Sequence, residues 1–206
     1  MNIEVVGLWL VALGSYLIGS LSFAVLVSRR MKLPDPRTFG SKNPGATNML
    51  RGGSRLGAAL ALLGDALKGW VAVWLTMHWL VPLGVDPLAT AVAALAVFLG
   101  HGYPVFFGFK GGKGVATALG ILVALNPLLG LCSLIVWLSV MAVTRISSLS
   151  ALCTAVATPL FSLFILSVWF LKVTVFLLAG WLLLHHHANI RKLLSGEETV
   201  FRKRSS

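Results

Sequence analysis

Three polar, glycine-containing segments hold most of the side chains that could perform chemistry in this 206-residue chain. The first, residues 40–51, places the Ser41 hydroxyl ten residues before the guanidinium of Arg51. A guanidinium binds phosphate oxygens through two parallel N–H donors, which makes this loop a candidate phosphate site. The alternative is structural: Ser41 is a turn residue, Arg51 anchors the topology, and Thr47-Asn48 are residue types that cap a following helix. The candidate phosphate-binding residues here are Gly40, Asn43, Gly45, Thr47 and Asn48, beside Ser41 and Arg51.

The second segment begins Gly100-His101-Gly102-Tyr103-Pro104 and continues to a Lys-Gly-Gly-Lys-Gly run over residues 110–114. Glycines allow consecutive backbone N–H groups to turn toward one anion, and a helix beginning at Val115 would add the positive end of its dipole. Lys113 would supply a full charge. The glycine spacing is not that of a Walker loop, and a flexible basic turn is the alternative. The candidate phosphate-binding glycines are Gly111, Gly112 and Gly114.

The third segment contains three consecutive histidines followed by Asn189. His186 and Asn189 are three residues apart, so on a helix they would share one face. Consecutive histidines do not converge on a helix, and no carboxylate is placed to complete a metal site. A solvated or packed histidine is the structural alternative to a catalytic one.

Composition predicts an integral membrane protein. Apolar residues make up 57% of the chain and charged residues 11%, with a mean hydropathy of +0.90, whereas soluble domains carry about 25% charged residues. Lys and Arg outnumber Asp and Glu by 17 to 6. In a membrane chain these cations orient helices and bind anions, so we expect no nucleic-acid partner. The few, scattered carboxylates predict no metal site and no cofactor.

Apolar runs predict an all-α, polytopic fold with seven transmembrane helices, some of them short. The runs cover residues 5–27, 56–80, 88–107, 115–143, 149–167 and 173–185, and Asn126-Pro127 divides the fourth. With seven spans, the N-terminus outside and the C-terminus cytoplasmic, most cations lie inside, as the positive-inside bias requires. We expect one membrane-embedded domain over residues 1–206. Asp65 and Lys68, three apart in an apolar run, are expected to neutralise each other or to brace the first loop, with a proton relay as the alternative. His78 and His101 give no functional signal.

The three segments together resemble the bacterial acyl-phosphate:glycerol-3-phosphate acyltransferases over nearly the whole chain. They read Gly-Ser-x-Asn-Pro-Gly-Ala-Thr-Asn-x-x-Arg, Gly-His…Pro-Val-Phe-x-x-Phe-Lys-Gly-Gly-Lys-Gly-Val-Ala-Thr and His-x-x-Asn-Ile. The resemblance implies a seven-helix inner-membrane enzyme. We expect it to be a monomer whose site faces the cytoplasm. It implies transfer of an acyl group from acyl phosphate to position 1 of glycerol 3-phosphate, giving lysophosphatidic acid and inorganic phosphate. The functional residues it implies are Ser41, Arg51, Lys113, His186 and Asn189, with Ser147 or Ser148 as a further serine.

This chemistry needs positioning and charge stabilisation more than a strong nucleophile, because an acyl phosphate is already activated. We therefore favour direct attack of the glycerol hydroxyl over an acyl-enzyme on Ser41. Lys42 departs from the family pattern, where glycine is common. Two other classes stay open on the sequence alone. One is a small transporter of phosphorylated or anionic solutes, and the other is a lipid phosphatase or metal-dependent phosphotransferase.

Overall fold

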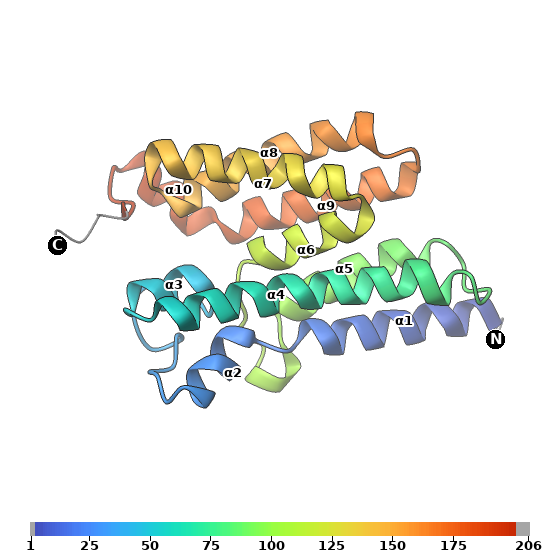
Figure 1. Ribbon diagram of the computed structural model, residues 1–206, viewed down its shortest axis with the longest axis horizontal. Helices are drawn as coiled ribbons and strands as arrows, with labels where there is room; N and C mark the ends of the chain where they lie inside the picture. The colour runs from blue at the N-terminus through green and yellow to red at the C-terminus, as the bar shows by residue number, and fades with distance from the viewer. Residues whose placement is uncertain (1–2, 201–206) are drawn as a thin grey trace. The chain divides into compact units, whose positions relative to one another are not determined.

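The computed structural model describes residues 3–200, and every regular element among them is helical, as predicted. These residues form two compact units, of which the first ends at Leu125 and the second begins at Asn126. The single domain expected over residues 1–206 stays a prediction. The first unit contains α1 (Ile3–Gly19), α2 (Phe23–Arg30), α3 (Ala46–Arg51), α4 (Arg55–Leu75), η1 (Thr76–Leu80), α5 (Ala89–Gly102), η2 (Val105–Phe107) and α6 (Val115–Leu125). The second contains α7 (Pro127–Thr144), α8 (Ser147–Ile165), α9 (Trp169–His185) and α10 (His187–Leu194) (Figure 1).

The helices match the predicted apolar runs closely. Among residues 3–200, four helices are long and apolar enough to cross a membrane, or up to six if each bent pair counts as one span. α6 is a shorter apolar helix of 11 residues. Large apolar side chains point outward along the helices, as with Trp9 at 69% and Phe164 at 90% exposure, which suits a lipid environment. The count of seven spans stays a prediction.

The predicted division at Asn126-Pro127 is confirmed. The Asn126 side chain caps α7 by accepting hydrogen bonds from the backbone N–H groups of Leu128 and Leu129, at 2.9 and 3.3 Å. Pro127 occupies the first helical position, where its missing N–H costs nothing. α6 and α7 are therefore separate helices.

The apolar run over residues 5–27 is divided between two helices. α1 ends at Gly19, α2 begins at Phe23, and the two are bent by 41°. The break frees the carbonyl of Leu21, which accepts a 2.7 Å hydrogen bond from Lys68 Nζ on α4. A lysine 47 residues away satisfies the opened backbone, so the local pattern contained no signal for the break.

Glycines allow the helices of the first unit to approach backbone to backbone. A Cβ on Gly19 of α1 would clash with the Val97 carbonyl of α5, and one on Gly100 of α5 with the Tyr16 carbonyl. A Cβ on Gly69 of α4 would likewise clash with the Thr117 carbonyl of α6. These contacts fix the end of α5 and the start of α6, between which the Lys-Gly-Gly-Lys-Gly segment lies.

The second unit is built on consecutive helices that lie side by side. α8 contacts both α7 and α9, and the connections at residues 145–146 and 166–168 are short enough to make neighbours antiparallel. The start of α8 and the end of α9 therefore lie at the same end of this unit (Figure 1).

Candidate functional site

Asn48 organises the first polar loop. Its side chain is 1% exposed, and Oδ1 accepts a 3.0 Å hydrogen bond from the backbone N–H of Ser41. Its Nδ2 donates to the carbonyls of Pro36 at 2.7 Å and Phe39 at 3.1 Å. The residue thus fixes the backbone on which Ser41 stands. The helix cap expected at Thr47-Asn48 is wrong, because Gly45 is the N-cap of α3 and both residues lie inside the helix.

Two residues beside Ser41 adopt left-handed backbone conformations. Gly40 has φ +56°, and a Cβ there would clash with the Asn48 amide. Lys42 has φ +55°, which costs a residue with a Cβ about 1–2 kcal/mol. This strain explains physically why glycine suits the position that Lys42 occupies.

An ion pair attaches the earlier part of this loop to the segment that follows α5. Arg37 donates to both carboxylate oxygens of Asp35, the shortest bond being 2.7 Å, and to the Phe107 carbonyl at 3.2 Å. Its guanidinium carbon lies 6.0 Å from the centre of the Phe107 ring. The hydrogen bonds from Arg37 hold the pKa of Asp35 below its usual value, so the pair is charged at neutral pH.

The Lys-Gly-Gly-Lys-Gly segment packs against the end of α5, and helix α6 begins at Val115 as predicted. The Gly112 N–H donates to the His101 carbonyl at 3.2 Å. A Cβ on Gly111 would clash with the carbonyls of His101 and Gly102, and one on Gly114, at φ +88°, with the Phe98 ring. Glycine is needed at these positions because the backbone runs directly over other atoms.

The two polar loops of the first unit meet at Gly112. A Cβ on Gly112 would clash with the His101 imidazole and would stand 3.2 Å from the Pro44 carbonyl of the first loop. The half-buried cations Arg51 and Lys113 belong to the two loops that meet. The structure thus brings together two segments that the sequence separates by about 60 residues, each carrying glycines and a cation.

Below the glycine loop lies a buried polar cluster that sequence analysis missed in part. Lys68 Nζ lies 2.8 Å from Asp65 Oδ1, which confirms the expected pair. His101, which gave no signal in the sequence, places Nδ1 3.1 Å from the Thr117 hydroxyl and 3.6 Å from the same Asp65 oxygen. The signal available in the sequence was the position of His101 between Gly100 and Gly102, nine residues before Lys110.

The other candidate residues belong to the second unit. His186 is 2% exposed, and its Nδ1 donates to the Leu182 carbonyl at 2.8 Å, so in the neutral ring Nε2 carries the lone pair. His186 lies at the junction of α9 and α10, which are bent by 58°, so it does not share a continuous helix with Asn189. Asn189 donates a 2.8 Å hydrogen bond to Glu198.

The structure distinguishes Ser147 from Ser148 at the start of α8. The Ser148 side chain is 9% exposed, and its buried Oγ has no hydrogen-bond partner among residues 3–200. Ser147 is half-buried and has a partner. A buried hydroxyl without a protein partner is the better candidate to bind a substrate oxygen.

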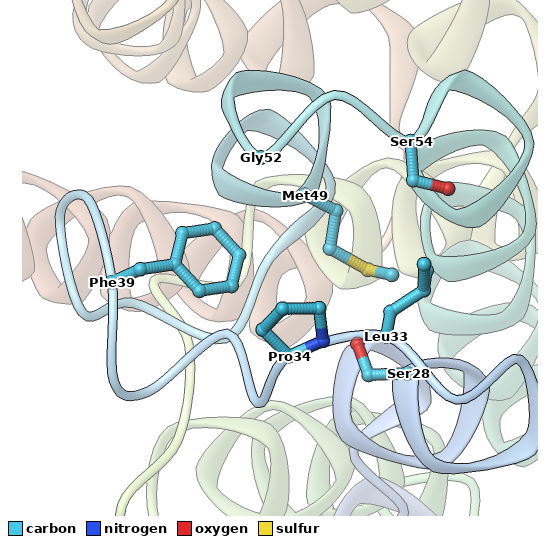
Figure 2. A pocket seen from close by; sticks show the side chains of 7 residues that line it. All are labelled: Ser28, Leu33, Pro34, Phe39, Met49, Gly52 and Ser54. Atoms are coloured by element: carbon cyan, nitrogen blue, oxygen red, sulfur yellow. The ribbon is translucent and has the colours of Figure 1, made fainter.

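A small cavity lies under the first loop (Figure 2). Its walls are mostly apolar, and none of its lining side chains is a cation, so it does not suit a phosphate. The Ser28 hydroxyl is buried there with no hydrogen-bond partner within the described part of the chain, whereas Ser54 Oγ accepts from the Gly57 N–H. The lining residues are Ser28, Leu33, Pro34, Phe39, Met49, Gly52 and Ser54.

The fold and its apolar exterior define an all-helical integral membrane protein with four to six candidate spans among residues 3–200. The family model described as glycerol-3-phosphate acyltransferase matches residues 9–196. The chain belongs to the glycerol-3-phosphate acyltransferase family and is an enzyme of phospholipid synthesis. The transporter and phosphatase alternatives are set aside by this membership.

Relatives and solved structures similar to this chain are also glycerol-3-phosphate acyltransferases. The chain is 55% identical to the glycerol-3-phosphate acyltransferase of Paraburkholderia phymatum over 190 residues, 92% of this chain and 90% of the relative. It superposes with TM-score 0.88 and 34% identity on the crystal structure of PlsY (YgiH), an integral membrane glycerol 3-phosphate acyltransferase in its glycerol 3-phosphate form, covering 95% and 96% of the two chains. The lysophosphatidic acid form of PlsY gives TM-score 0.86 and 33% identity, covering 95% of each chain.

Proposed function

We propose that this enzyme takes its acyl group from acyl phosphate and transfers it to position 1 of glycerol 3-phosphate. The products are lysophosphatidic acid and inorganic phosphate. The acceptor glycerol 3-phosphate and the product lysophosphatidic acid are the ligands named for the two forms of the solved relative. The observation that carries the proposal is the meeting of the two loops at Gly112, which brings together two glycine-bearing backbones whose segments carry Arg51 and Lys113. Such an arrangement suits the two phosphate groups that this reaction must hold.

In the proposed reaction the glycerol hydroxyl oxygen attacks the acyl carbonyl carbon. The new C–O bond forms, the bond between the acyl carbon and the phosphate oxygen breaks, and its electron pair leaves with inorganic phosphate. The hydroxyl proton ends on a phosphate oxygen. Because the donor is activated, positioning and charge stabilisation carry the catalysis.

Individual roles follow from chemistry and from the family resemblance. Arg51 and Lys113 hold phosphate groups, while Ser41 and Asn189 orient them. His186 positions the acceptor hydroxyl or relays its proton through Nε2. The proposed phosphate-binding set also includes Gly40, Asn43, Gly45, Thr47, Gly111, Gly112, Gly114 and Ser148.

Asn48 acts by holding the Ser41 backbone, as its three hydrogen bonds indicate. The enzyme needs no metal or cofactor and works as a monomer.

We further propose seven spans in the bacterial inner membrane, with the N-terminus outside and the site on the cytoplasmic face. The support is the positive-inside bias of the loops. The broken pairs α1–α2 and α9–α10 would each count as one span, and α6 as a short one.

The test is phosphate release by the purified protein in lipid, given acyl phosphate with and without glycerol 3-phosphate, in excess EDTA and without CoA. We expect release that depends on the acceptor and matches lysophosphatidic acid mole for mole. Ser41→Ala and Lys113→Ala should each lower it about tenfold or more, whereas His187→Ala should not. Turnover by the folded protein with acyl-CoA but not with acyl phosphate would contradict the proposed donor.

A further inference from the structure

We propose that His101 is a positioning residue that sets the place of the glycine loop, acting through a buried polar cluster formed with Asp65, Lys68 and Thr117. The inference rests on the proposed phosphate-binding role of residues 111–114. His101 itself does not touch substrate in this account.

The first observation is how closely His101 holds the loop. Its backbone carbonyl accepts the Gly112 N–H, and its imidazole lies where any Cβ on Gly112 would be. On its other side, Gly112 faces the Pro44 carbonyl. The edge of the imidazole therefore supports the glycine loop at Gly112, the residue at which that loop meets the first polar loop.

The second observation is how the ring itself is held. Nδ1 lies 3.1 Å from the Thr117 hydroxyl in the first turn of α6 and 3.6 Å from Asp65 on α4. Asp65 pairs with Lys68, which also donates to the Leu21 carbonyl at the break between α1 and α2. The cluster thus connects α4, α5, α6 and the α1–α2 break below one loop.

The third observation is that burying such a cluster costs folding free energy. All four side chains are at most 6% exposed, and buried ion pairs contribute little net stability compared with well-packed apolar residues. Apolar side chains could pack these helices together equally well, but they could not hold the His101 imidazole in a single orientation by hydrogen bonding. The polar cluster therefore indicates that the orientation of the ring is what matters.

The direct test compares two isosteric substitutions, Thr117→Val and Thr158→Val. Thr158 is 4% exposed and its hydroxyl lies 2.9 Å from that of Ser133 in the second unit, so Thr158→Val also removes a buried hydroxyl contact. We expect Thr117→Val to raise the KM for glycerol 3-phosphate, acyl phosphate or both about tenfold, with kcat within threefold, because a loosened loop loses phosphate binding. Thr158→Val should leave both KM values within twofold, and Thr117→Ser should restore them.

Equal KM values in Thr117→Val and the wild type, or equal effects of Thr117→Val and Thr158→Val, would overturn the inference. If Thr117→Val does not fold, His101→Asn provides the second test, because it removes the ring edge under Gly112. The same rise in KM is then expected, and an unchanged KM overturns the inference. A wild type without acceptor-dependent turnover would instead contradict the proposed function.

Discussion

Replacing Asn48 by alanine should open the first polar loop without unfolding the helices. The side chain makes three hydrogen bonds to loop backbone, to Ser41, Pro36 and Phe39. At about 0.7–1 kcal/mol each, the three lost hydrogen bonds amount to roughly 2–3 kcal/mol of local stability. That free energy corresponds to an increase of about 30- to 150-fold in the population of the open loop.

Amide hydrogen exchange of the enzyme in lipid nanodiscs measures this opening directly. Amides in residues 38–48 should exchange about 30- to 150-fold faster in Asn48→Ala, while those of α4 keep their rates. Asn43→Ala is the matched control, since Asn43 is a half-buried asparagine of the same loop, and it should change exchange less than threefold. Exchange in residues 38–48 that stays within threefold of the wild type in Asn48→Ala would refute the role given to Asn48.

Three further predictions concern the loops. Lys42→Gly should relieve the left-handed strain at φ +55° and gain about 1 kcal/mol, seen as a rise of about 2–4 °C in Tm; no rise would contradict the strain. The hydrogen bonds from Arg37 hold the pKa of Asp35 below its usual value of 3.8. The contribution of this ion pair to the free energy of unfolding is therefore complete above pH 3.8 and is lost as the pH falls through the lower pKa of the folded state. The Tm difference between wild type and Asp35→Asn should therefore be constant from pH 5 to 7 and shrink below pH 3.8; a difference independent of pH would argue against the pair. Gly114→Ala should raise the KM for the phosphate substrates about tenfold, because its Cβ meets Phe98, whereas Gly108→Ala, also left-handed but facing open space, should leave KM unchanged.

The sequence pattern predicted those structural features that depend on residues close together in the chain. The apolar runs, the helix start at Val115 and the division at Asn126-Pro127 depend on local sequence, and all three are present in the structure. The Asp65–Lys68 pair was predictable because three residues separate the partners on one helix.

Contacts between distant segments were not predictable in this way. The break after Gly19 depends on a lysine of another helix, and the structural role of Asn48 depends on carbonyls up to 12 residues earlier in an irregular loop. The positioning role proposed for His101 depends on Thr117 and Gly112, which only the fold brings next to its ring. The position of His101 between two glycines at the end of an apolar run did not indicate which residues would surround the ring.

The central claim is that the glycine loop binds substrate phosphate through Lys113, and a pair of lysines on that segment tests it most directly. The measurement is kcat/KM for glycerol 3-phosphate and for acyl phosphate in Lys113→Gln and Lys110→Gln, each of which removes one positive charge from the same loop. Lys110 is exposed and Lys113 half-buried. The account predicts a loss of about 10- to 100-fold in Lys113→Gln for at least one substrate, the value of one charge-assisted hydrogen bond, and a change within twofold in Lys110→Gln. Equal effects of the two substitutions would show that the loop acts only through its general charge, and would contradict the account.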